Sequence, residues 1–219
     1  MRPCPAVPSA NRSSTPVRPR RSARLVCVAG AFATALLGSC SKSSDPPTNA
    51  IQQYVVVKGV SYNLGRLIDF VSAAEQGMQT LAQQRPGSPQ ARSFLSGART
   101  GWNNVLVQTT DFTPTQAGVV PGLAAAVLAS KEAATHWLTG LSSVSKQVTS
   151  GSVGSFDPLW KKFTRARTDE AKARTALAAA TATLAGMACS LETSHPELAP
   201  SATKAADCST ASTLAAASP

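Results

Sequence analysis

Residue types that commonly carry enzyme chemistry are scarce in this chain. It contains only two histidines in 219 residues. It has no Gly-x-Ser-x-Gly element, no glycine-rich phosphate-binding loop and no EF-hand loop. An enzyme site needs a nucleophile with a base and an orienting group, or a cluster of metal ligands. The sequence therefore favours a non-enzymatic protein, and it predicts no catalytic residue, no metal and no other cofactor.

Acidic residues are absent from the first 39 positions, which carry six arginines: Arg2, Arg12, Arg18, Arg20, Arg21 and Arg24. An apolar segment of about 13 residues follows, from Leu25 to Leu37, whereas a bilayer span needs ~20. Positive charge before a short apolar segment is typical of an export signal, because the charge stays on the cytoplasmic side. We therefore expect residues 1–39 to be a signal peptide.

The signal ends in Leu37, Gly38, Ser39 and Cys40, which resembles the lipobox of bacterial lipoproteins. The resemblance covers about 40 of the 219 residues. It implies that Cys40 is acylated by palmitate-type chains, becomes the new N-terminus and anchors the protein in a lipid bilayer, where several chains hold more firmly than one. Ser41 in place of Asp implies the outer membrane, facing the periplasm. An ordinary cleaved signal with a chance cysteine is the alternative.

The charge of residues 40–219 is much milder than that of the whole chain. The net charge of +10 falls to +4, because six of the 21 basic residues and none of the 11 acidic residues precede Cys40. So mild a balance predicts no nucleic-acid partner. We divide this part into a lipidated cysteine with a flexible polar tether (40–50), a helical domain (51–192) and a C-terminal segment (193–219).

Apolar residues from position 57 onward recur at spacings of three and four, which predicts one buried helix face. That face consists of Val57, Val60, Leu64, Leu67, Val71, Ala74, Met78 and Leu81. The run Tyr54–Val57 is β-prone, so a short strand there is an alternative start. In the next helix, Ser88 should be the N-cap and Pro89 the first residue. We expect its buried face to consist of Ala91, Phe94, Ala98, Trp102 and Val105.

Two further helices follow an irregular connection over residues 113–122. The buried face of the first is expected to consist of Leu123, Val127, Ala134, Trp137, Leu141, Val144 and Val148, with Ser130 in register. The second should start at an Asp157 N-cap. Its buried face is expected to consist of Leu159, Phe163, Ala166, Ala173, Leu177, Ala180, Leu184 and Leu191. The uncharged stretch Thr175–Leu191 is expected to be a core helix rather than a membrane span. Ser201–Ala217 should add a short helix. The pattern predicts an all-α antiparallel bundle of about four long helices.

The cysteines left after processing form one pair. Cys189 and Cys208 remain once Cys40 is lipidated, and an even pair in an oxidising compartment predicts a disulfide. Closing a loop of about 20 residues contributes ~3 kcal/mol in the chain-entropy model. The alternative is a metal site that adds His195 and Glu192, although the tight ligand pairs of zinc sites are missing.

Six basic residues gather within fourteen positions: Lys161, Lys162, Arg165, Arg167, Lys172 and Arg174. One interpretation is a solvated helix face in which Arg165 pairs with Asp169 and Glu170 with Arg174. The other is a surface for an anionic envelope component or an acidic envelope protein, favoured by a short tether to a membrane.

The sequence leaves three functional hypotheses, of which the first leads. It is a non-enzymatic interaction or structural module of the bacterial envelope. The second is a binder of a small ligand, lipid or cell-wall polymer at a cleft near Trp102, Trp137 and Trp160. The third is a hydrolase that uses His136, which requires acids nearby. The tetrads Ser143–Lys146 and Ser201–Lys204 have no Lys-Thr-Gly element to complete a penicillin-binding site.

Overall fold

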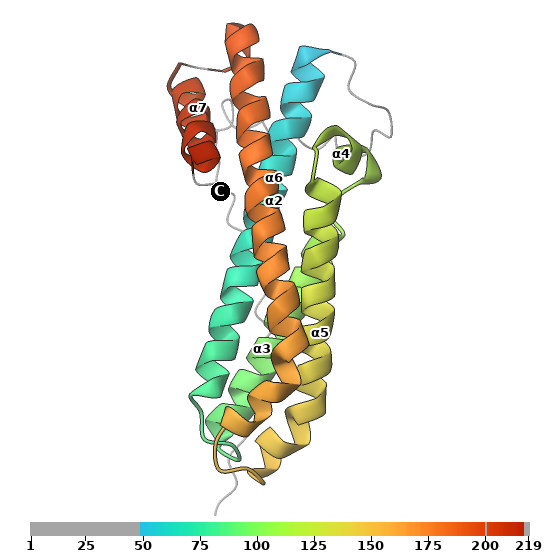
Figure 1. Cartoon of the computed structure of the whole chain (residues 1–219), viewed down its shortest axis with the longest axis vertical. Coiled ribbons are helices and arrows are strands. Elements are labelled where there is room, and N and C mark those ends of the chain that lie inside the picture. Colours follow the sequence, from blue (N-terminus) through green and yellow to red (C-terminus); the bar gives the residue numbers. More distant parts are fainter. Residues whose placement is uncertain (1–48, 200, 217–219) are drawn as a thin grey trace, which may run out of the picture.

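The computed structural model describes residues 49–199 and 201–216, and every regular element in those residues is helical. Four long helices run alternately down and up the molecule (Figure 1): α2 (Ala50–Ala82), α3 (Pro89–Thr109), α5 (Leu123–Ser150) and α6 (Thr164–Ser194). The predicted all-α antiparallel bundle is therefore confirmed. The predicted signal peptide and the lipobox residues Leu37, Gly38, Ser39 and Cys40 lie outside the described residues.

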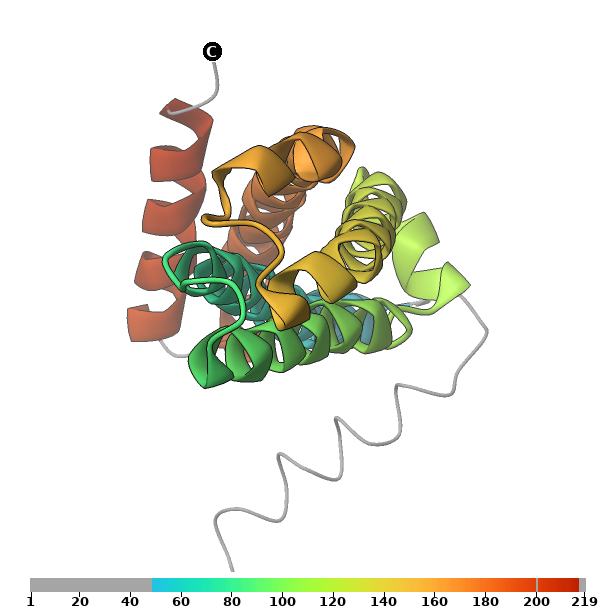
Figure 2. The ribbon, with the colours of Figure 1, turned by 90° about the horizontal axis from the view of Figure 1, so that it is seen from below.

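The four long helices form a ring around one apolar core (Figure 2). α2 contacts α3 and α6, and α5 contacts the same two helices. Helices that are consecutive in sequence are thus neighbours in space, as short connections require. A further helix, α7 (Ser201–Ala216), packs against α6 on the outside of the ring.

Helix α2 follows its predicted pattern closely, except at its start. All eight residues of the predicted face are buried. The helix begins seven residues before Val57, because the Asn49 side chain accepts a hydrogen bond from the backbone N–H of Gln52 at 2.9 Å and caps it. The alternative strand at Tyr54–Val57 was wrong. Packing of Val57 in the helical register overrides the β-propensity of this run.

Helix α3 begins as predicted, but one of its core residues differs. Ser88 caps it by accepting a hydrogen bond from Ala91 N–H at 3.0 Å, and Pro89 is its first residue. Leu95 is buried, whereas Phe94 is 38% exposed. Both positions fit a spacing of three or four from Ala91 and Ala98, so the spacing alone could not choose between them.

The connection before α5 is more regular than predicted. It contains the short helix α4 (Pro114–Val119), which a capping box of Thr113 and Gln116 starts. Gly122, at a φ of 81°, then leads into α5. In α5, Val127 is only partly buried and Ala126 is buried in its place. A local polar pattern thus builds a helix within a segment that the apolar spacing predicts to be irregular.

The entry to α6 also corrects a prediction. Asp157 is not an N-cap, because a 3-10 helix, η1 (Asp157–Phe163), precedes α6 and is capped by Phe156 without a side-chain hydrogen bond. The tighter turn brings Phe156 and Phe163 into one stacked pair at 5.9 Å in the core. Gly140 on α5 makes room for this ring, because a Cβ there would lie 2.6 Å from Phe163 Cδ1.

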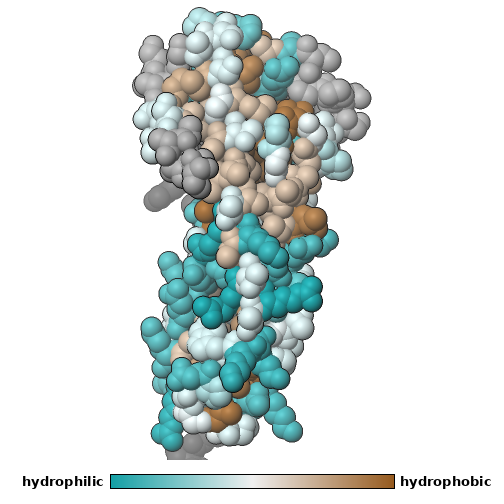
Figure 3. All heavy atoms as spheres, viewed as in Figure 1, coloured by the Kyte–Doolittle hydropathy of each residue, from teal (hydrophilic) through white to brown (hydrophobic). Residues whose placement is uncertain are grey.

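The upper and lower halves of the molecule differ in surface character. Hydrophilic residues cover the lower half of the face that α6 crosses, and weakly hydrophobic ones cover the upper half (Figure 3). By length and composition alone, one described helical stretch, Asp157–Ser194, is apolar enough to cross a membrane. Here it packs against α2, α5 and α7, and 28% of its apolar window is buried. Leu191 at its end is only partly buried.

Candidate binding site

Two consecutive carboxylates are buried where α6 packs against α5. Asp169 is 8% exposed and Glu170 is 6% exposed. Burying a carboxylate is costly unless hydrogen bonds and opposite charges compensate it. The two side chains find different partners, so this pair of residues organises two neighbouring polar clusters.

Asp169 contacts three basic side chains. Its Oδ2 lies 2.7 Å from His136 Nδ1 on α5 and 3.8 Å from Arg165 Nε, and its Oδ1 accepts a hydrogen bond from Lys172 Nζ at 3.2 Å. Burial works to raise the pKa of Asp169, but the hydrogen bonds from Lys172 and His136 outweigh it and the pKa is lowered. The acid that the His136 hydrolase hypothesis required is therefore present.

Glu170 belongs to a network that crosses three helices. Its Oε2 accepts a hydrogen bond from Trp137 Nε1 at 2.9 Å, and its Oε1 accepts one from Arg174 Nε at 3.1 Å. Arg174 also pairs with Glu75 on α2. Burial raises the pKa of Glu170; the hydrogen bonds from Arg174 and Trp137 oppose this rise, and the Glu75 charge adds to it.

The tryptophans named from the sequence gather beside this network, but they differ in exposure. Trp102 and Trp137 stack in the core with ring centroids 5.4 Å apart and exposures of 0% and 2%. Trp160 is only partly buried and meets Trp137 edge-on at 6.4 Å. The guanidinium of Arg167 lies 5.7 Å from the centre of the Trp160 ring. Trp102 is thus a core residue, and Trp160 is the ring that reaches the surface.

A cleft of about 570 Å³ opens between these side chains. Its lining includes two tryptophans, two arginines and two glutamates: Trp137, Trp160, Arg167, Arg174, Glu75 and Glu170. Pockets that combine aromatic walls with a few fixed polar groups are typical ligand sites. We call this feature the tryptophan cleft.

The six predicted basic residues divide into paired and unpaired groups. Both expected pairs are present, at 3.8 Å between Arg165 and Asp169 and at 3.1 Å between Arg174 and Glu170, and Lys172 joins Asp169. Among the described residues, the other three cations have no carboxylate within ion-pair distance: Lys161, Lys162 and Arg167. These three are exposed. The region therefore carries surplus positive charge.

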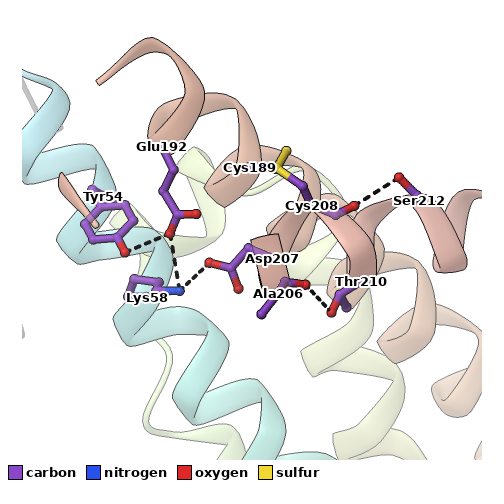
Figure 4. Close-up of a disulfide and its surroundings, with 9 residues drawn as sticks. All are labelled: Tyr54, Lys58, Cys189, Glu192, Ala206, Asp207, Cys208, Thr210 and Ser212. Carbon is purple, nitrogen blue, oxygen red and sulfur yellow. Dashed lines mark hydrogen bonds and ion pairs between the residues drawn. A yellow bond between two sulfur atoms is a disulfide. The ribbon is translucent and has the colours of Figure 1, made fainter. Parts of the chain in front are cut away.

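A second polar cluster lies near the opposite end of α6, next to the disulfide that joins Cys189 and Cys208 (Figure 4). Glu192 is 0% exposed; its Oε1 accepts a hydrogen bond from Tyr54 Oη at 2.8 Å and lies 3.6 Å from Lys58 Nζ. Burial and the Glu192 carboxylate raise the pKa of Tyr54. Lys58 Nζ also forms an ion pair with Asp207 Oδ2 of α7, at 2.5 Å.

The predicted disulfide is confirmed, with Cα atoms 4.8 Å apart. The alternative interpretation of these cysteines as metal ligands was therefore wrong. Both cysteines are consumed in the bond, and His195 lies 3.1 Å from Glu197. Within residues 49–199 and 201–216, no three side chains of His, Cys, Asp or Glu are grouped as metal ligands. This end of the molecule has the contacts of a structural clamp on α7.

Sequence reasoning named Asp169 and Glu170 only as partners of basic residues and missed their burial. A signal was present, because the predicted apolar stripe of α6 skips from Ala166 to Ala173. Positions 169 and 170 fill that gap at helical spacing. The contribution of Glu75 had no comparable signal, since it depends on how α2 lies against α6.

Together, the fold and the site define an all-α, disulfide-linked bundle with an aromatic and charged cleft. No protein-family model matches this chain, and no curated protein or solved structure matches it significantly.

Proposed function

We propose that this chain is a non-enzymatic lipoprotein of the bacterial envelope whose helical bundle binds an anionic envelope component. Acylated Cys40 anchors it in the outer membrane, and the bundle faces the periplasm. The lipobox residues that precede Cys40 support the anchor. The helical domain starts at Ala50, so a tether of about ten residues keeps it close to the membrane surface, where added basic residues strengthen binding to anionic partners.

The observation that carries the proposal is the set of exposed, unpaired cations Lys161, Lys162 and Arg167. Opposite charges three or four residues apart on a helix stabilise one another, and the other three basic residues here are paired with carboxylates. The unpaired three lie in η1 and the first turn of α6, beside the tryptophan cleft. Their charge is available to a partner without breaking an internal ion pair.

Co-sedimentation with purified wall sacculi and with anionic phospholipid vesicles tests this proposal. We expect the full chain to bind at least one of these materials at low salt and to release it as salt rises, because salt screens exposed charges. The triple variant K161Q/K162Q/R167Q should bind more weakly. The control R66Q/R85Q/K131Q removes the same charge elsewhere and should bind like wild type. Equal loss in both variants, or no binding to either material, would overturn the proposal.

A hydrolase is the second candidate, and the His136–Asp169 contact is the observation that favours it. A carboxylate on Nδ1 orients an imidazole and leaves Nε2 as a base. A panel of ester, amide and glycoside substrates would test this candidate. Turnover that disappears in H136Q but persists in the control H195Q would establish it, and absence of turnover in the wild-type chain would reject it for those substrates.

A further inference from the structure

We propose that the tryptophan cleft binds an acidic saccharide, that is, a pyranose ring carrying a carboxylate or phosphate group. This inference rests on the proposed function, because it names the chemical class of the anionic component and the site that recognises it. Three properties of the cleft support it: an aromatic wall, a fixed set of hydrogen-bonding groups and a single cation that no carboxylate neutralises.

Trp160 supplies the aromatic wall. Edge-on contacts with Trp137 at 6.4 Å, Phe156 at 5.3 Å and Phe163 at 5.8 Å fix the orientation of its ring, while the side chain stays partly exposed. The C–H bonds on one face of a pyranose present a flat apolar surface that packs against such an indole. In the structure, the guanidinium of Arg167 lies over this ring, 5.7 Å from its centre. A cation over an exposed ring is weakly held, so an incoming sugar can displace it.

The charged side chains behind the ring suit hydroxyl groups. Arg174 is shared between Glu75 and Glu170, and the Trp137 indole holds Glu170 from the core side. Arg174 compensates part of the charge of the two carboxylates, and these mutual contacts orient the three side chains, so they offer donors and acceptors already in position. Such preorganisation lowers the entropic cost of binding.

Arg167 is the residue that binds the acidic group of the ligand. It is the lining cation that has no carboxylate partner among the described residues, and a guanidinium forms strong, bidentate hydrogen bonds with carboxylate or phosphate. A ligand with one negative charge therefore gains an ion pair here, whereas its neutral counterpart gains none.

The test compares N-acetylmuramic acid with its methyl ester, which keeps the sugar and the lactyl group but not the negative charge, by calorimetry and tryptophan fluorescence on the full chain. We expect the acidic sugar to bind at least about tenfold more tightly, because a hydrogen bond to a charged group has that effect. R167Q should abolish the preference, and the control K131Q, which changes an exposed cation of α5 outside the lining, should retain it. Circular dichroism verifies that each variant is folded.

Several outcomes would overturn the inference. Equal affinity for the two sugars, or a preference that survives R167Q, would contradict the role of the cleft. Inorganic phosphate that shifts the fluorescence as much as the acidic sugar does would indicate a simple anion site. Competition by soluble wall glycan or by phosphorylated core oligosaccharide of lipopolysaccharide would support the class and identify its source. Sacculus or vesicle binding without any sugar binding would refute this inference alone and leave the proposed function standing.

Discussion

The indole N–H of Trp137 donates a hydrogen bond to Glu170 across 2.9 Å, although both side chains are almost completely buried. This contact joins the aromatic core of the bundle to its charged surface. On one side, Trp137 stacks on Trp102; on the other, Glu170 orients Arg174 toward Glu75. The stability of the core and the geometry of the tryptophan cleft therefore depend on the same hydrogen bond.

Removal of the Glu170 carboxylate should destabilise the fold moderately. E170A leaves the Trp137 N–H buried without its acceptor, which costs about 1–3 kcal/mol. The larger cost of an orphaned buried charge, about 3–5 kcal/mol, does not apply, because Arg174 is partly exposed and keeps Glu75. Urea unfolding measures the difference. The exposed Glu132 is the matched control, and E132A should change the free energy of unfolding by less than about 0.5 kcal/mol.

The two adjacent carboxylates should give opposite pH dependences. Glu170 has a raised pKa, so the folded state holds its proton more tightly and stability falls as pH rises from the ordinary glutamate pKa through the folded one. Asp169 has a lowered pKa, so its contribution is present above the ordinary aspartate pKa and disappears as pH falls through the folded one. Urea unfolding of wild type, E170Q and D169N across this range measures both effects.

Each variant should remove one limb of the pH profile. E170Q should lose the decline above the ordinary glutamate pKa, and D169N should lose part of the decline at acid pH. D69N, at an exposed aspartate on α2, should retain the wild-type profile. Identical profiles in wild type and E170Q would contradict the assignment for Glu170.

Much of this fold was predictable from the sequence because apolar spacing determines which helix face is buried. All eight positions of α2 follow from that rule. The rule failed where two apolar residues fit equally well, as Phe94 and Leu95 do, and where polar residues occupy the buried stripe, as Asp169 and Glu170 do. Their burial depends on partners from other helices, such as Trp137 and Glu75, whose positions spacing does not encode. A cleft near the tryptophans was predicted, but the glutamates Glu75 and Glu170 in its lining were not.

Close packing at Gly140 gives a test of the core that does not involve charge. A Cβ at this position would lie 2.6 Å from Phe163 Cδ1, and that ring is confined by Trp137 at 5.1 Å and Phe156 at 5.9 Å. We expect G140A to lower the free energy of unfolding by about 1–3 kcal/mol, as overpacking does. Gly97, in the interior of α3, has open space where a Cβ would lie. G97A should therefore stabilise by about 0.4–1 kcal/mol, and the same denaturation experiment compares the two.

Acylation of Cys40 is testable independently of the bundle. In cells given labelled palmitate, the wild-type chain should carry the label and fractionate with membranes, whereas C40S should lose the label and leave the membrane fraction. C189S/C208S is the matched control, because it removes two cysteines outside the lipobox and should stay labelled. Label that persists in C40S would refute the lipoprotein assignment.

Helix α7 should detach when the disulfide is broken, while the four-helix ring stays folded. None of the side chains described in α7, those of residues 206–213, is buried. Its described polar link to α2 is the ion pair between Asp207 and Lys58, and such partly exposed pairs contribute only about 0–1 kcal/mol. The Cys189–Cys208 bond, by contrast, contributes ~3 kcal/mol in the chain-entropy model. The covalent bond therefore dominates the attachment of this helix.

Hydrogen exchange followed by mass spectrometry measures this detachment. Reduction, or the variant C189S/C208S, should greatly accelerate exchange in α7 and leave the buried segments of α2 and α5 protected. D207N keeps the disulfide and should have a much smaller effect. Thiol titration of the unfolded chain should find two more thiols after reduction than before it. Loss of protection throughout the bundle would show that α7 is integral to the core, whereas unchanged exchange in α7 would show that its noncovalent contacts suffice.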